Sequence, residues 1–176
     1  MDLKSYIQIV PNALDKKFCL DIVENKKYKY AQAKILGDNS KGRTDTEIRN
    51  CSSTPVLDKD DGIVFQSIGR IIANYIDKTK CVLPENINDS GYEILKYETG
   101  GFYKKHTDDV MGTPRRIAIS ILLNEEYQGG EFQFFEDYKV QGGTGTAIAF
   151  PANYCYPHEV LPILEGTRYS IITWVS

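Results

Sequence analysis

The chain has 176 residues, 41% of them hydrophobic, which is enough for one domain with a proper core. The formal net charge of −3 gives no electrostatic reason to expect a nucleic-acid partner. No apolar run reaches the roughly 18 residues that a membrane span requires, and the N-terminus lacks the apolar stretch of a signal peptide. We therefore expect a single cytoplasmic domain with no membrane contact.

Two amphipathic helices are expected in the first half of the chain. The first follows Asn12, which we expect to cap it because an acidic residue, Asp15, comes three positions later. The second runs roughly from Asp61 to Asp77, where apolar side chains recur at helical spacing. Both helices are typical of struts that pack on a sheet.

The polar segment Gly37–Asp45 lies between these two helices. It is either a surface loop or a mobile lid over a site, and the residues alone leave both interpretations open.

From Gly91 onward, short segments rich in β-branched and aromatic residues alternate with glycine turns. This pattern predicts an all-β sandwich or barrel, with the helices bracing one side. The end of the chain, from His158 to Trp174, suggests two strands that meet near Glu165 and Gly166. The expected strands are Tyr92–Tyr97, Ile117–Leu123, Glu131–Phe135, Thr146–Phe150 and Arg168–Val175.

The four cysteines are scattered along the chain and form no C-x-x-C pair. The pattern is typical of reduced thiols in a cytosolic protein rather than of a disulfide framework or a zinc knuckle. They are Cys19, Cys51, Cys81 and Cys155.

The chain contains only two histidines, His106 and His158. His106 forms a His-x-Asp pair with Asp108, and residues two apart in an extended segment project to the same face. Two imidazoles and one carboxylate suit a mononuclear Fe(II) ion and leave coordination positions open. Each feature alone has an ordinary alternative, since His-x-Asp pairs are common and a lone histidine is more often a hydrogen-bonded structural group.

Arg168 follows His158 in an apolar and aromatic stretch that includes Ile171, Ile172 and Trp174. The alternative is a surface arginine, but such surroundings seldom hold an idle charge. Because a guanidinium binds a carboxylate through two parallel hydrogen bonds, Arg168 is predicted to anchor a carboxylate of a cosubstrate.

The second half of the chain resembles the prolyl 4-hydroxylase-like 2-oxoglutarate/Fe(II) dioxygenases. The resemblance is carried, in sequence order, by Tyr97–Asp108, Arg116–Asn124, Gly129–Phe132 and Gly145–Pro151, followed by His158, Pro162, Gly166, Arg168 and Trp174. It implies a mainly β protein with supporting helices and a double-stranded β-helix (jelly-roll) core. Residues 1–90 would then form the N-terminal support of a single domain, and residues 91–176 its catalytic core.

The resemblance also implies roles for individual residues. The three metal ligands would be His106, Asp108 and His158, and Arg168 would bind the distal carboxylate of 2-oxoglutarate. Further family positions near the cosubstrate are Tyr97, Tyr103, Asn124 and Trp174.

One position departs from the family pattern. Several relatives have a cosubstrate-binding tyrosine where this chain has Leu122, which leaves more of the anchoring to Arg168, Tyr97 and Ser170.

We therefore expect a dioxygenase that uses Fe(II), 2-oxoglutarate and dioxygen, with ascorbate as a candidate reductant. It would hydroxylate an unactivated C–H bond of a prolyl residue in a peptide or protein and release succinate and carbon dioxide. Alternative substrates are a lysyl residue, a free amino acid or another small molecule. A nucleic acid is not expected, because nucleic-acid dealkylases usually carry a second arginine where this chain has Trp174. The remaining alternatives are a zinc hydrolase and a non-redox binding jelly roll.

Overall fold

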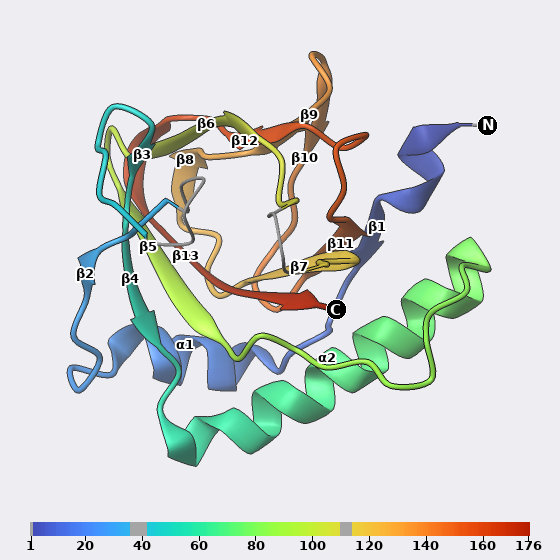
Figure 1. The fold of residues 1–176 in the computed structure, drawn as a ribbon. Helices are drawn as coiled ribbons and strands as arrows, with labels where there is room; N and C mark the ends of the chain where they lie inside the picture. The colour runs from blue at the N-terminus through green and yellow to red at the C-terminus, as the bar shows by residue number, and fades with distance from the viewer. Residues whose placement is uncertain (1, 36–41, 110–113) are drawn as a thin grey trace.

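The computed structural model describes residues 2–35, 42–109 and 114–176, and these form two facing antiparallel β-sheets with two helices on one outer side (Figure 1). The larger sheet has the order β1-β11-β7-β13-β5-β4-β2, with β8 paired to β13. The smaller sheet has the order β10-β9-β12-β6-β3. The arrangement confirms the expected jelly roll with supporting helices.

The helical elements are η1 (Leu3–Tyr6), α1 (Lys16–Glu24) and α2 (Asp58–Thr79). The strands of the larger sheet are β1 (Gln8–Val10), β2 (Ala31–Gln32), β4 (Ser52–Pro55), β5 (Glu93–Glu98), β7 (Ile117–Leu122), β8 (Tyr127–Gly129), β11 (Ala147–Pro151) and β13 (Ile163–Val175). Those of the smaller sheet are β3 (Arg49–Asn50), β6 (Phe102–His106), β9 (Phe132–Phe134), β10 (Tyr138–Val140) and β12 (His158–Val160).

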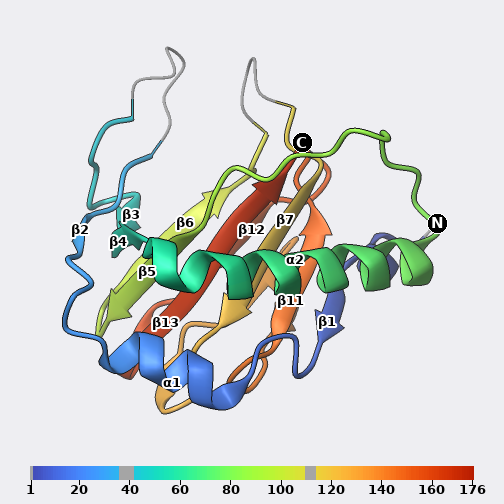
Figure 2. The ribbon, with the colours of Figure 1, turned by 90° about the horizontal axis from the view of Figure 1, so that it is seen from below.

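The larger sheet separates two apolar layers because its side chains alternate between its faces. Ile117, Ile119 and Ile121 of β7 pack toward α1 and α2, whereas Ala118 and Leu122 of the same strand face the space between the sheets. Figure 2 shows α1 and α2 lying across the outer face of this sheet. The helices thus shield one face, and the functional residues lie on the other.

The start of α1 differs from the prediction. Asp15, not Asn12, is the N-cap, and its carboxylate accepts a hydrogen bond from the Phe18 amide. Asn12 instead has a positive φ of 54°, a turn conformation that asparagine tolerates better than most residues. The second helix is also longer than predicted at both ends.

The end of the chain also differs from the prediction. The break between the last two strands falls at Leu161 and Pro162, because proline lacks the amide hydrogen that a ladder needs. Gly166 lies inside β13 at a positive φ of 82°, next to a register shift in the pairing with β8. The glycine therefore bends one long strand rather than ending it.

No helix within the described ranges has the length and apolarity needed to cross a membrane. All four cysteines carry free thiols.

Candidate metal and cosubstrate site

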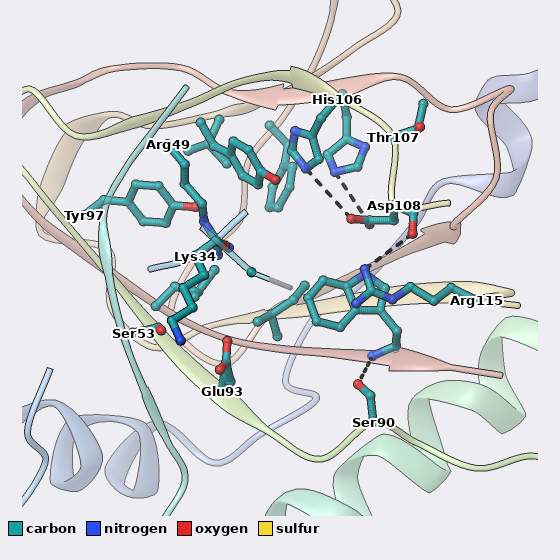
Figure 3. Close-up of a pocket in the computed structure, with 18 of the residues that line it drawn as sticks. Lys34, Arg49, Ser53, Ser90, Glu93, Tyr97, His106, Thr107, Asp108 and Arg115 are labelled. Atoms are coloured by element: carbon teal, nitrogen blue, oxygen red, sulfur yellow. Dashed lines mark hydrogen bonds and ion pairs between the residues drawn. The ribbon is translucent and has the colours of Figure 1, made fainter. Parts of the chain in front are cut away.

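Three side chains meet at one end of the smaller sheet, between the two sheets. His106 is the last residue of β6 and His158 the first of β12, and the two are paired directly across the ladder. Asp108 follows two residues after β6 and lies between them, with one carboxylate oxygen 3.8 Å from His106 Nε2 and the other 3.7 Å from His158 Nε2 (Figure 3). One donor atom from each residue lies within 4.8 Å of the others, a spacing that allows them to share one ion.

Backbone carbonyls orient both imidazole rings. His106 Nδ1 lies 2.8 Å from the Lys104 carbonyl oxygen, and His158 Nδ1 lies 3.1 Å from that of Tyr156. A proton on each Nδ1 leaves Nε2 free to bind a metal, which is the usual arrangement around ligating histidines. Burial, helped by the nearby His158, lowers the pKa of His106 to about 3, so its imidazole is neutral at physiological pH.

The three donors border a cavity of about 610 Å³, a volume typical of small-molecule sites. Its inner wall is apolar, whereas exposed polar side chains such as Lys34 and Glu93 lie farther out. The apolar wall consists of Leu95, Phe132, Phe150, Val160 and Ile172.

Arg168 lies beside this cavity and is only 1% exposed. Its guanidinium carbon is 5.4 Å from the centre of the Tyr97 ring and 5.2 Å from that of Phe132, and both rings line the cavity. Nη1 donates a hydrogen bond to the Ser170 hydroxyl at 3.1 Å. Nε and Nη2 have no partner among the described residues, so the edge of the guanidinium that could bind a carboxylate is unpaired.

The other predicted positions divide into two groups. Tyr97, Tyr103 and Trp174 line the cavity. Asn124 does not, because its side-chain amide donates to the Thr167 carbonyl and accepts from the Tyr169 amide, which fixes it to β13. Leu122 is buried in the apolar layer between the sheets.

Two further arginines, Arg49 and Arg115, also line the cavity. Arg49 is 8% exposed, and its guanidinium carbon lies 4.7 Å from the centre of the Tyr103 ring. The Arg115 guanidinium carbon lies 3.8 Å from the centre of the Trp174 ring. Arg49 and Cys51 are buried and Asn50 between them is exposed, an alternation typical of a strand. The sequence around Arg49 does not predict that this arginine is buried.

The segment Gly37–Asp45, for which the sequence left a surface loop and a lid both open, falls mostly outside the described residues. Of its described part, Arg43 pairs with Ile35 in an isolated bridge, and its side chain forms an ion pair with Asp45 at 3.2 Å.

The chemistry of the site fits the cofactor and the cosubstrate that the sequence suggested. Two imidazoles and one carboxylate suit Fe(II) and could hold it on one face. The unpaired edge of Arg168 suits a carboxylate beside the cavity.

Comparison with known proteins agrees with this geometry. Residues 92–176 match the model of the 2OG-Fe(II) oxygenase superfamily. A PKHD-type hydroxylase of Alteromonas mediterranea is 32% identical over 40% of this chain and 32% of its own length. A PKHD-type hydroxylase of Delftia acidovorans is 31% identical over 53% of this chain and 43% of its own length. The chain thus spans less than half the length of these curated relatives.

Solved structures share the fold of nearly the whole chain. A prolyl hydroxylase of Trichoplax adhaerens, in complex with a peptide fragment of hypoxia-inducible factor, covers 97% of this chain and 83% of its own, with a TM-score of 0.77 and 16% identity. A viral collagen prolyl hydroxylase of Paramecium bursaria Chlorella virus-1, in complex with 2OG, covers 97% of this chain and 95% of its own chain. Its TM-score is 0.69 and its sequence identity 21%. Residues 92–176 are thus similar to the 2OG-Fe(II) oxygenase superfamily, a match that implies Fe(II), 2-oxoglutarate and dioxygen, and the solved prolyl hydroxylases share the fold of the chain.

Proposed function

We propose that this protein is a 2-oxoglutarate- and Fe(II)-dependent dioxygenase that hydroxylates a prolyl residue in a peptide or protein and releases succinate and carbon dioxide. The observation that carries the proposal is a single cavity bordered by three metal donors, with the buried Arg168 beside it, whose Nε and Nη2 are unpaired.

In this proposal, His106, Asp108 and His158 bind Fe(II) through Nε2, a carboxylate oxygen and Nε2. When bound, the iron supplies dioxygen activation, coupled to decarboxylation of the cosubstrate and oxidation of a substrate C–H bond. Arg168 binds the distal carboxylate of 2-oxoglutarate through Nε and Nη2, and Ser170 orients the guanidinium from its other side. The apolar wall of the cavity keeps water away from the reacting groups.

The prolyl substrate is supported by the lining of the cavity and by the likeness to prolyl hydroxylases. Phe132 and Phe150 line the cavity with their ring centres 6.0 and 4.7 Å from that of His158, and this aromatic surface suits an apolar ring such as pyrrolidine. Exposed residues at the outer part of the cavity, including Lys34 and Glu93, leave room for flanking peptide. One of the related structures contains a bound peptide fragment.

The experiment combines the purified protein with Fe(II), 2-oxoglutarate, ascorbate and dioxygen, and presents proline-containing peptides, free L-proline and free L-lysine in parallel. We expect a peptide to gain one oxygen atom by mass spectrometry, with one succinate formed for each product. His158→Ala is the matched control and should form neither.

The possible outcomes separate the two parts of the proposal. Oxygen gain by free proline alone would show that the peptide assignment is wrong while the reaction class holds. If 2-oxoglutarate is not consumed under any condition, including with excess Fe(II), the dioxygenase assignment itself is wrong.

A further inference from the structure

A column of three side chains connects the candidate metal ligand His106 to the wall of the cavity. The rings of Tyr103 and His106 are stacked, with their centres 3.6 Å apart and their planes at 18°. The guanidinium carbon of Arg49 lies 4.7 Å from the centre of the Tyr103 ring. Two groups this close to the ring cannot share one face, so Tyr103 lies between His106 and Arg49.

The backbone builds this column from two strands. Arg49 of β3 and Tyr103 of β6 are directly paired across the ladder, which places their side chains on the same face. His106 ends β6 three residues beyond Tyr103, and a register shift between their partners His158 and Val160 on β12 gives β6 one extra residue, which allows both rings to lie on the same face. At the other end of the column, Arg49 Nη1 donates a hydrogen bond to the Lys34 carbonyl oxygen at 2.8 Å.

Arg49 depends on Tyr103 for much of its stabilisation. It is 8% exposed, it forms no ion pair with any carboxylate in the described part of the chain, and its Nε has no partner there. A buried cation without a counter-ion is unfavourable unless other groups stabilise it. The negative face of the Tyr103 ring supplies such stabilisation, so Arg49 and Tyr103 hold each other in place.

We infer that Arg49 is a positioning residue for the metal site. Arg49 holds the Tyr103 ring nearly parallel to the His106 ring. The stacked Tyr103 ring in turn fixes the direction of His106 Nε2 toward Asp108 and His158. The Lys104 carbonyl holds Nδ1 at one edge of the same ring. The hydrogen bond to Lys104 fixes the Nδ1 edge of the His106 ring, and the stacked Tyr103 ring fixes its plane. Together the two contacts restrict rotation of the His106 side chain. The inference relies on the proposed function only for the role of His106 as a metal ligand.

Cobalt(II) alone is the probe, because its visible absorption reports ligand geometry without dioxygen, cosubstrate or turnover. The variants are Arg49→Leu, Tyr103→Leu and the double variant, each titrated with Co(II). We expect Arg49→Leu to raise the Co(II) dissociation constant about tenfold, as loss of an outer contact to a metal ligand commonly does, and to change the visible bands. In the Tyr103→Leu background, Arg49→Leu should change the constant less than about twofold, because the connecting ring is already missing.

The matched control is Arg43→Leu, which removes an exposed arginine that is ion-paired with Asp45. This variant should bind Co(II) like the wild type. Tyr103→Phe retains the ring and should keep the wild-type spectrum, which provides a test if Arg49→Leu does not fold.

Three results would overturn the inference. The first is that Arg49→Leu raises the Co(II) dissociation constant equally in the wild-type and Tyr103→Leu backgrounds. The second is that Tyr103→Phe impairs Co(II) binding as much as Tyr103→Leu does. Both would leave the metal site and the proposed function intact. The third is failure of the wild-type protein to bind Co(II), which would remove the metal assignment as well.

Discussion

Replacing Arg168 with methionine should leave the ligand-free protein folded with little change in stability while removing most of its affinity for 2-oxoglutarate. Arg168 is 1% exposed and makes one side-chain hydrogen bond, to Ser170, while Nε and Nη2 remain unpaired. Loss of the Ser170 bond leaves the buried Ser170 hydroxyl unpaired, which costs about 1–3 kcal/mol. Replacement of buried charged groups by apolar ones of similar volume is often neutral or stabilising by about 1–4 kcal/mol. The two effects largely offset each other, so the free energy of unfolding should change by less than about 3 kcal/mol.

The loss of cosubstrate affinity follows from the same unpaired edge. Two hydrogen bonds from a guanidinium to a carboxylate contribute about 1.5–3 kcal/mol each. Together they amount to about 3–6 kcal/mol, which corresponds to about a hundredfold or larger increase in the dissociation constant. Metal binding should change little, because Arg168 does not contact the three metal donors.

Calorimetry measures both quantities, with Co(II) in place of iron to prevent turnover. The wild type should melt at a higher temperature when 2-oxoglutarate is added, and Arg168→Met should show no such shift. Arg116→Met, at an exposed arginine, is the control and should behave like the wild type. A variant that melts several degrees lower than the wild type yet still binds 2-oxoglutarate with wild-type affinity would refute the reasoning.

Three further expectations concern stability, thiol chemistry and the support of Arg168. Tyr28→Phe should lower the free energy of unfolding by about 1–3 kcal/mol in denaturant titrations, because the Tyr28 hydroxyl donates a hydrogen bond to buried Asp60. The control is Tyr154→Phe, at an exposed tyrosine, and an equally small loss in both variants would contradict this expectation. Cys19 should resist alkylation at pH 8 until the protein unfolds, because burial raises its pKa to about 12; labelling in the native state would show that this packing is wrong. Gly130→Ala should weaken 2-oxoglutarate binding in the same calorimetric titration, because a Cβ there would clash with the Ile163 side chain and crowd Arg168 Cδ, 3.1 Å away. Unchanged affinity would show that these side chains can move aside.

Part of the second half of the fold was predictable, because β5, β7, β11 and β13 have five or more residues and show a pattern, whereas β6, β8 and β10 were not predicted. For example, Ile117–Leu123 was expected and β7 covers Ile117–Leu122. The strands β1 to β4 were not predicted, since each has two to four residues and is defined by its partners in the sheet. Asn12 was misread because Asp15, three residues later, is itself a good N-cap.

The candidate site was predictable to a similar degree. The chain has only two histidines, and these follow a recognisable order with Asp108 and Arg168, which the structure brings to one cavity or to its edge. Arg49 was missed because its burial depends on contacts with residues far away in the sequence. Lys34 and Tyr103, which hold it, can be identified as neighbours only after the strands are paired.

The most direct test of the account is an anaerobic titration of the Fe(II)-loaded protein with 2-oxoglutarate, followed by visible absorption. Chelation of the metal by the cosubstrate should produce a weak charge-transfer band in the wild-type protein, and His158→Ala should not produce it. A wild-type protein that binds Fe(II) but develops no band, or a His158→Ala variant that retains the band, would contradict the proposed site.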